Sequence, residues 1–189
     1  QFNGHCVKQL RENAKLADPA AESKRQVSPI GVVAHLAAQA GVRYSLEHEA
    51  ETLYNNVIGT GVVLRASQKF GVQHICAASS SSVYGESSTP PFSEDQACNE
   101  PISPYACSKR CNELWAYTFQ KVYGVPVTMM RFFTVYGPRG RPDMATLQFM
   151  EKMSRNEPIN RYGSGDAIRE FTYIYDIIDG ILLLAKNPH

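Results

Sequence analysis

The sequence has few cysteines, no strong excess of either charge and no long apolar run. Its five cysteines show no zinc-site spacing, and an odd number cannot all pair as disulfides. Reduced thiols, and with them a cytoplasmic setting, are therefore expected, unless a segment outside this sequence tethers the protein to a membrane. A formal net charge of +1 gives no sign of a nucleic-acid partner. No stretch approaches the ~18 apolar residues of a membrane-spanning helix.

Three short apolar runs alternate with helical patterns, which predicts an α/β fold. The runs cover residues 31–36, 72–78 and 125–133, and the main helical patterns cover residues 47–70 and 105–123. Crossovers of this length connect parallel strands in a right-handed sense. Further helices are expected at residues 8–21, 145–154 and 177–186, and a short strand at 171–174. Loops are expected at 86–100 and 133–143, and a hairpin or loop at 161–169. The sequence thus predicts a partial, doubly wound parallel sheet of Rossmann type.

The chemistry of the chain centres on Tyr105 and Lys109, which lie four residues apart at the start of a predicted helix. Ser103 is a good N-cap and Pro104 suits the first helical position, so Tyr105 falls in the first turn. Residues i and i+4 share one helix face, and a nearby cation favours the phenolate of a tyrosine whose pKa is ordinarily about 10. Ser80, at the end of the preceding strand, could hold a substrate oxygen while the proton moves. The alternative is an ordinary solvated pair.

Apolar residues on the same helix follow a helical period. They are Cys107, Cys111, Leu114, Trp115 and Val122. At ~100° per residue the centre of this stripe lies about 200° from Tyr105. We therefore expect the stripe to be buried and Tyr105 and Lys109 to face a cleft.

Polar residues follow several predicted strands at their carboxyl ends, where ligands of parallel α/β sheets bind. These residues are Gln39 after the first run, Ser79, Ser80, Ser81 and Ser82 after the second, and Thr134 after the third. Their convergence at one edge of the sheet predicts a binding site there.

Several segments together resemble the extended short-chain dehydrogenase/reductase family of NAD-dependent nucleotide-sugar epimerases and dehydratases. Within that family the UDP-glucuronate 4-epimerases are the most similar. The matching segments are residues 35–45, 79–85, 105–109, 131–138 with 141–144, and 169–173. Their order along the chain is the order found in the family.

The resemblance implies a role for individual residues. Tyr105 would take the proton of the sugar 4-hydroxyl, with Lys109 and Ser80 completing the catalytic set. The implied NAD contacts are Ala37, Ala38, Gln39, Ser79, Tyr105, Lys109 and Phe133. The implied contacts to a UDP-sugar are Ser81, Ser82, Thr134, Arg141, Tyr162 and Arg169. Surface charge is the alternative for the two arginines, and packing is the alternative for Tyr162.

The resemblance also separates subtypes of the family. Its 4,6-dehydratases carry an Asp-Glu pair where this chain has Ser81 and Ser82, and its decarboxylases usually carry Glu at the position of Ser82. Hydroxyls can hold a sugar carboxylate without acting as acid or base. An epimerase acting on UDP-glucuronate is therefore the expected parent activity, with another nucleotide-sugar epimerase or a decarboxylase as alternatives.

The chain departs from the family at its start, where a glycine-rich turn normally binds the NAD pyrophosphate. Residues 1–30 hold a single glycine, Gly4. We expect an internal fragment of a longer protein, with an incomplete NAD-binding domain over residues 1–140 and the start of a small substrate-binding region over 141–189. A non-catalytic binding protein is the alternative. The family also implies a homodimer formed through residues 47–70 and 105–123.

Overall fold

The computed structural model describes residues 30–86, 90–161, 164–165 and 168–187. The helix expected at residues 8–21, and Tyr162, lie outside the described residues. Three parallel strands form the main sheet in the order β1 (Val32–His35), β2 (His74–Ala78) and β3 (Val127–Met130). All three lie within the runs that predicted them, so the parallel α/β sheet is confirmed.

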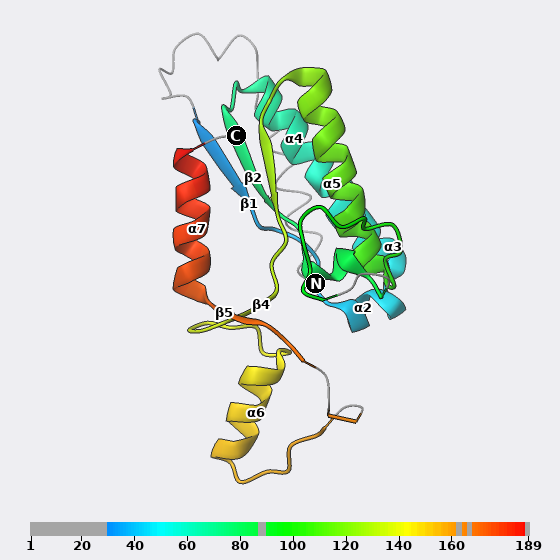
Figure 1. Cartoon of the computed structure of the whole chain (residues 1–189), viewed down its shortest axis with the longest axis vertical. Coiled ribbons are helices and arrows are strands. Elements are labelled where there is room, and N and C mark those ends of the chain that lie inside the picture. The colour runs from blue at the N-terminus through cyan, green and yellow to red at the C-terminus, as the bar shows by residue number, and fades with distance from the viewer. Residues whose placement is uncertain (1–29, 87–89, 162–163, 166–167, 188–189) are drawn as a thin grey trace.

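Helices cover both faces of this sheet (Figure 1). On one face lie α4 (Gly59–Lys69) and α5 (Pro104–Tyr123), and on the other lies α7 (Ile174–Lys186). The expected helix at 47–70 differs in detail, because helical structure already begins with α2 (Val42–Glu47). His48 interrupts it, and α3 (Glu49–Leu53) then runs through a π-helical turn (Tyr54–Ile58) into α4. Gly71 follows α4 with a left-handed φ of 67°, a conformation that favours glycine just past a helix end.

The sequence predicts the ends of α5 correctly. The Ser103 hydroxyl accepts a hydrogen bond from the Ala106 N–H at 3.1 Å, and Pro104 is the first helical residue. Gly124 ends the helix with a φ of 69°. These signals depend only on local backbone geometry, which explains why they could be read from the sequence.

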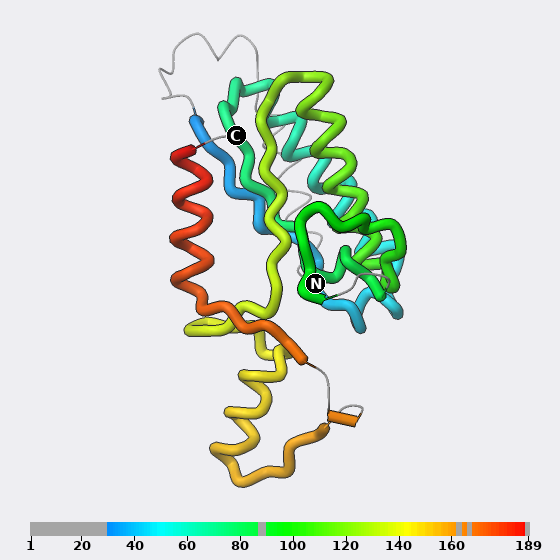
Figure 2. The backbone as a smooth tube through the Cα atoms, viewed as in Figure 1, coloured from blue at the N-terminus to red at the C-terminus, as the bar shows by residue number. Residues whose placement is uncertain are grey.

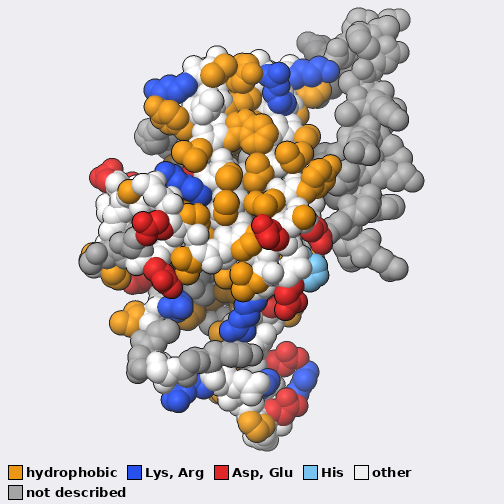
Figure 3. All heavy atoms as spheres, turned by 90° about the vertical axis from the view of Figure 1, so that its right-hand side faces the viewer, with side chains coloured by type: hydrophobic (Ala, Val, Ile, Leu, Met, Phe, Trp, Pro, Cys, Tyr) orange, Lys and Arg blue, Asp and Glu red, His pale blue; other side chains and the backbone are white. Residues whose placement is uncertain are grey.

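The predicted buried face of α5 is wrong. The helix turns a mixed face to the sheet, namely Ala106, Ser108, Lys109, Asn112, Glu113, Ala116 and Phe119. The apolar stripe instead lies outside, with Leu114 54% and Val122 64% exposed. Figure 3 shows hydrophobic side chains gathered on this outer side of α4 and α5. Apolar periodicity located the wrong side because the inward polar groups find partners within the fold, which removes the usual cost of burying them.

The main core lies between the sheet and these two helices. Leu64 of α4 and Phe119 of α5 pack against Val72, Ile75 and Ala77 around strand β2. Each of the five is at most 5% exposed. A single layer of apolar side chains therefore fixes α5 on the sheet and determines where its first turn lies.

The chain beyond β3 forms a smaller lower part before it returns to the sheet (Figure 2). β4 (Thr134–Tyr136) pairs in parallel with β5 (Phe171–Tyr173), so part of the loop expected at 133–143 is a strand. Between them lies α6 (Ala145–Ser154), as expected. α7 begins at Ile174, three residues before its predicted start, and lies beside β1 and β2. The division near residue 140 stays a prediction, and α7 belongs spatially with the main sheet.

Candidate active site

The serine run continues directly from the carboxyl end of β2. Ser79 and Ser80 are buried, and Ser81 opens a 3₁₀ helix (Ser81–Tyr84). The Ser80 hydroxyl caps this helix by accepting the Ser82 N–H at 3.2 Å, and it donates to the Ser82 hydroxyl at 3.1 Å. The local structure therefore fixes Ser80 at the sheet edge where the sequence placed a site.

Lys109 of α5 is buried beside the same strand end. Its ammonium donates to the Ala78 carbonyl at 2.8 Å and lies 6.0 Å from the centroid of the Tyr105 ring. Burial lowers the pKa of Lys109 from 10.5 to about 8, because removing an ammonium from water disfavours its charged form. The side chain is thus poised to lose or keep its proton near neutral pH.

We predict that the free energy of unfolding rises with pH because of Lys109. Between pH 8 and 10.5 the folded state holds this amine neutral while the unfolded chain still binds its proton. From pH 7 to pH 10 the wild-type protein should therefore gain about 2–3 kcal/mol relative to Lys109→Met. Urea unfolding of both proteins across this range measures the difference. Parallel curves for the two proteins would contradict the prediction.

Tyr105 lies in the first turn of α5, half-buried, with its phenol at Ser80. Burial raises the pKa of Tyr105, and the hydrogen bond with Ser80 and the charge of Arg141 lower it part of the way back. The sequence argument expected the cation at Lys109 to favour the phenolate. Instead the Lys109 ammonium is bonded to Ala78, and desolvation outweighs the favourable contributions. In this structure the Tyr105 phenol therefore holds its proton more firmly than a free tyrosine.

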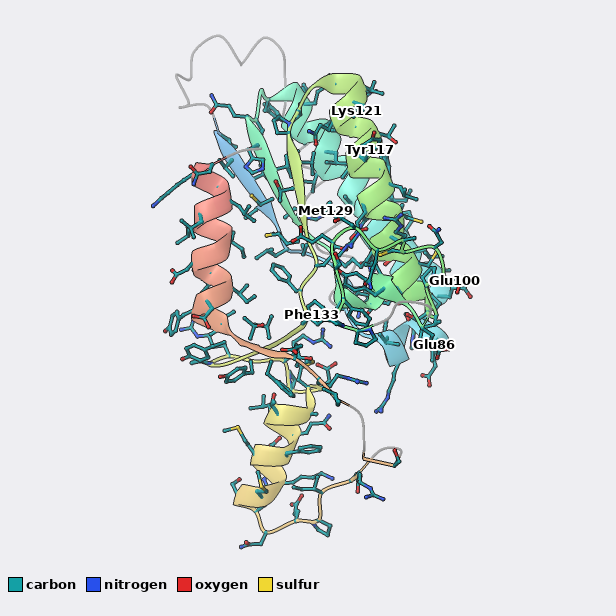
Figure 4. The ribbon with its side chains drawn as sticks, viewed as in Figure 1. Glu86, Glu100, Tyr117, Lys121, Met129 and Phe133 are labelled. Atoms are coloured by element: carbon teal, nitrogen blue, oxygen red, sulfur yellow. The ribbon has the colours of Figure 1, made fainter. Side chains whose placement is uncertain are left out.

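A second Tyr-x-x-x-Lys pair lies on the same helix, and sequence reasoning did not single it out. Figure 4 labels Tyr117 and Lys121 on α5. The Lys121 ammonium lies 5.5 Å from the Tyr117 ring centroid, but Tyr117 is 65% exposed. Spacing alone does not distinguish the two pairs. They differ because Lys109 is buried at the end of β2, whereas Tyr117 is exposed.

The segment after β1 is held against α5 by a buried asparagine. The Asn56 amide accepts the Gln39 N–H at 2.7 Å and donates to the Gln39 carbonyl at 3.0 Å and to the Ser108 hydroxyl at 2.9 Å. Ala37 and Ala38 beside it are exposed. Asn56 therefore has a packing role. His35 on β1 bonds Thr60 on α4 at 3.1 Å.

A hollow of about 820 Å³ adjoins this segment. It is lined by residues 38–44 on one side and by Arg141, Asp143 and Phe149 on the other. The Arg141 guanidinium pairs with the Asp143 carboxylate at 2.9 Å, and its charge acts on Tyr105. The structure thus brings Arg141 toward the predicted site. Arg169 is exposed and donates to the Ile168 carbonyl at 2.7 Å, away from these contacts.

An aromatic cluster borders the serine run on its other side. The Tyr84 ring stacks on Phe92 at a centroid distance of 4.6 Å and lies 6.2 Å from Phe133. Figure 4 shows Phe133 on the segment that leaves β3. Thr134 follows it at the start of β4 and is half-buried.

Sequence reasoning missed Glu113, a buried carboxylate of α5. It accepts hydrogen bonds from Ser79 at 2.6 Å and from Arg131 at 2.9 and 3.0 Å. Burial raises the pKa of Glu113, but the bonds from Arg131, Ser79 and Arg110 outweigh it and hold the pKa below its usual value. The Ser79 hydroxyl was predicted to contact a cofactor, but in this structure it donates its hydrogen bond to Glu113. The one available signal was the spacing of four residues from Lys109 to Glu113.

Among the described residues, no three or more His, Cys, Asp or Glu side chains gather closely enough to hold a metal ion. In the same part of the chain, no helix combines the length and apolar character needed to cross a membrane.

A parallel sheet with helices on both faces and polar residues at the carboxyl ends of its strands is the arrangement of a Rossmann-type dinucleotide-binding protein. The chain belongs to the NAD dependent epimerase/dehydratase family, whose model matches residues 6–189. Family membership, anticipated from the motifs, is thereby confirmed.

Three relatives show how similar the chain is to individual members of this family. A probable UDP-glucuronate 4-epimerase of Rhizobium meliloti is 42% identical over 97% of this chain and 52% of its own length. The structure of UDP-glucuronic acid 4-epimerase from Bacillus cereus with UDP-glucuronic acid and NAD is 39% identical, with a TM-score of 0.76 over 81% of this chain and 48% of that one. TunA, an NAD-dependent NDP-hexosamine 5,6-dehydratase, is 35% identical, with a TM-score of 0.79 over 85% of this chain and 53% of its own. The chain spans about half the length of the curated relatives it matches.

Proposed function

We propose that the protein carrying this chain is an NAD-dependent epimerase that inverts C4 of UDP-glucuronate to give UDP-galacturonate. The observation that carries the proposal is the half-buried Tyr105 phenol beside Ser80, with Lys109 fixed at the same strand end. Relatives named UDP-glucuronate 4-epimerases, at 42% and 44% identity, support it. The intact protein is the protein in which this chain occurs.

The described residues suit one half of the NAD site. Lys109, Tyr105 and Phe133 supply a buried amine, a phenol and an aromatic ring, the groups implied for the nicotinamide and its ribose. Ala37, Ala38 and Gln39, the other residues implied for NAD, follow the carboxyl end of β1. Between residues 30 and 86 the structure describes no glycine-rich turn between a strand and a helix that would hold the pyrophosphate. When bound, NAD supplies reversible hydride acceptance.

The protein's own residues handle the proton and the orientation of the sugar. Tyr105 takes the proton of the 4-hydroxyl while Ser80 holds that oxygen by a hydrogen bond. Because burial raises the pKa of Tyr105, its phenolate is a stronger base toward the 4-hydroxyl, and the hydrogen bond with Ser80 and the charge of Arg141 are the contributions that favour this ionised form. Lys109, whose pKa is about 8, can carry or lose a positive charge beside this proton transfer.

Ser81, Ser82 and Thr134 would hold the sugar and its carboxylate. Arg141 and Arg169 would contact the nucleotide and diphosphate, and Tyr162 corresponds to the aromatic position near the uracil. These are proposals carried from the family motifs. Arg suits phosphate because its guanidinium binds two oxygens at once. Neither Ser81 nor Ser82 can act as the acid or base that water loss requires. For that reason we favour epimerisation over the dehydratase chemistry named for TunA.

A substrate panel tests this proposal. The intact protein is incubated with UDP-glucuronate, UDP-glucose and UDP-N-acetylglucosamine, and products are separated by anion-exchange chromatography. We expect UDP-galacturonate from the first sugar and little turnover of the two that lack a C5 carboxylate. Turnover of a neutral sugar alone would favour another epimerase, and release of CO₂ would favour a decarboxylase. NAD binding without any turnover would contradict the enzyme proposal.

We further propose that the intact protein is a cytoplasmic homodimer. Support for the dimer comes from the outer apolar face, which we define as Val62, Leu114, Trp115, Tyr117 and Val122. All five are at least 37% exposed. The Trp115 ring lies directly over Gly61, so α4 and α5 present one continuous surface. Contiguous apolar surface of this kind commonly marks an interface. The four described cysteines are free thiols, which suits a reducing compartment.

We predict that Leu114→Asp makes the intact protein monomeric. Leu114 is 54% exposed, so the charge is solvated in a monomer but would be desolvated in the proposed interface. Sedimentation velocity measures the change, and Met150→Asp on α6, where Met150 is 63% exposed, is the control that should remain dimeric. A wild-type monomer, or a Leu114→Asp dimer, would contradict the proposed interface.

A further inference from the structure

Glu113 is a buried carboxylate that the mechanism above does not use. It is 8% exposed and lies one helical turn beyond Lys109. Its donors come from three elements: Ser79 at the end of β2, Arg131 after β3, and Arg110 on α5 at 2.9 Å. Because a buried carboxylate is costly unless each oxygen is bonded, this arrangement has little freedom to move.

Through Ser79, the Glu113 carboxylate holds the residue directly before Ser80. The Ser79 N–H donates to the Met130 carbonyl at 2.8 Å, and its hydroxyl donates to Glu113. One turn earlier on the helix, Lys109 donates to Ala78. Consecutive turns of α5 are thus bonded to consecutive residues of the strand end. The helix that presents Tyr105 and the strand that presents Ser80 are joined at this point.

Through Arg131, the same carboxylate reaches the far end of the serine segment. The Arg131 guanidinium lies 5.0 Å from the centroid of the Tyr84 ring and donates to the Glu94 carbonyl at 3.2 Å. Tyr84 ends the 3₁₀ helix that begins at Ser81. Movement of Arg131 would therefore displace both the serine segment and the loop that contains Glu94.

We propose that Glu113 is a positioning residue, which sets through Ser79 and Arg131 where Ser80 presents its hydroxyl to Tyr105. It is not itself a catalytic residue, because its carboxylate oxygens are engaged by Ser79, Arg110 and Arg131. The kinetic consequences below rest on the proposed function.

Glu113→Gln in the intact protein tests the proposal by kinetics. The amide keeps the shape but loses the charge that binds Arg131, so we expect kcat for UDP-glucuronate to fall about 10- to 100-fold, as small displacements of reacting groups do. KM should change less than threefold. Glu151→Gln, which breaks the exposed pair with Arg155 on α6, is the matched control and should leave both constants unchanged.

Ser79→Ala tests the link between Glu113 and the serine run separately. It removes the Ser79–Glu113 hydrogen bond and leaves the Glu113–Arg131 ion pair, which supports the fold, in place. We expect the same direction of change in kcat, with NAD affinity within twofold of wild type. A loss of NAD affinity would instead assign Ser79 as the cofactor contact that the sequence indicated, and would overturn the proposed link.

A measurement without turnover separates this inference from the proposed function. The Tyr105 phenol is titrated by NMR in protein labelled with ¹³C-tyrosine, its signal identified with Tyr105→Phe. The groups acting on this phenol are Ser80, Arg141 and the more distant Lys109. Losing the Ser80 hydrogen bond raises the pKa of Tyr105, whereas losing the negative charge of Glu113 alone would lower it.

We therefore expect the Tyr105 titration to move to higher pH in both Glu113→Gln and Ser79→Ala. An unchanged or lowered titration would overturn the inference, even if kcat fell, because Ser80 would not have moved. If wild-type protein turns over none of the sugars, the proposed function fails, and the titration still decides the role of Glu113.

Discussion

Replacing Tyr105 by Phe should reduce epimerisation by the intact protein about 10²- to 10⁴-fold, the range for loss of a positioned acid–base group. The substitution removes one oxygen and keeps the half-buried ring, so the fold should persist. Binding of UDP-glucuronate should change little, because the implied nucleotide contacts lie elsewhere. The measurement is kcat by product chromatography, with thermal unfolding to confirm an intact fold.

Tyr117→Phe is the matched control for this experiment. It removes the same atom from a tyrosine with the same spacing to a lysine on the same helix, but on the exposed side. Its kcat should equal that of the wild type. A Tyr105→Phe protein with undiminished turnover would remove the basis of the proposed mechanism.

Phe119→Ala should lower the free energy of unfolding by about 3–5 kcal/mol, the usual cost of emptying a packed aromatic site. Phe119 is 2% exposed and packs with Leu64 and Ile75 between α5 and the sheet. Because α5 also presents Tyr105 and Lys109, the same variant should lose activity as the helix loosens. Urea unfolding at a concentration where the protein is monomeric measures the effect.

Val122→Ala provides the comparison for Phe119→Ala. Val122 belongs to the apolar stripe that the sequence placed inside, yet it is 64% exposed. In the monomer its truncation should cost less than about 0.5 kcal/mol, as exposed substitutions usually do. A cost for Val122→Ala as large as that for Phe119→Ala would support the sequence prediction that the apolar stripe of α5 is buried.

Features that depend on local backbone chemistry could be predicted from the sequence. Ser103, Pro104 and Gly124 fix the ends of α5, and short apolar runs located all three strands of the sheet. The parallel topology followed from the length of the connections. Convergence of polar residues at the strand ends led to Ser80, and the four-residue spacing to Lys109 led to Tyr105, whose phenol the structure places at Ser80.

Features that depend on tertiary partners could not be predicted in this way. The inward face of α5 carries Ser108, Asn112 and Glu113, and only their bonds to Asn56, Ser79 and Arg131 make burial acceptable. Apolar periodicity therefore marked the outer face as the core. The pKa of Tyr105 also depends on burial against the strand end, so its direction could not be inferred from the spacing to Lys109.

Isotope incorporation from solvent tests the central claim most directly, because the proposed chemistry exchanges a proton only at the 4-hydroxyl. The intact protein is incubated with UDP-glucuronate in D₂O, and the UDP-galacturonate formed is analysed by NMR and mass spectrometry. The account predicts product with no deuterium bound to carbon, since Tyr105 acts on oxygen and Ser81 and Ser82 provide no base for C5. Deuterium at C5 of the product would contradict it.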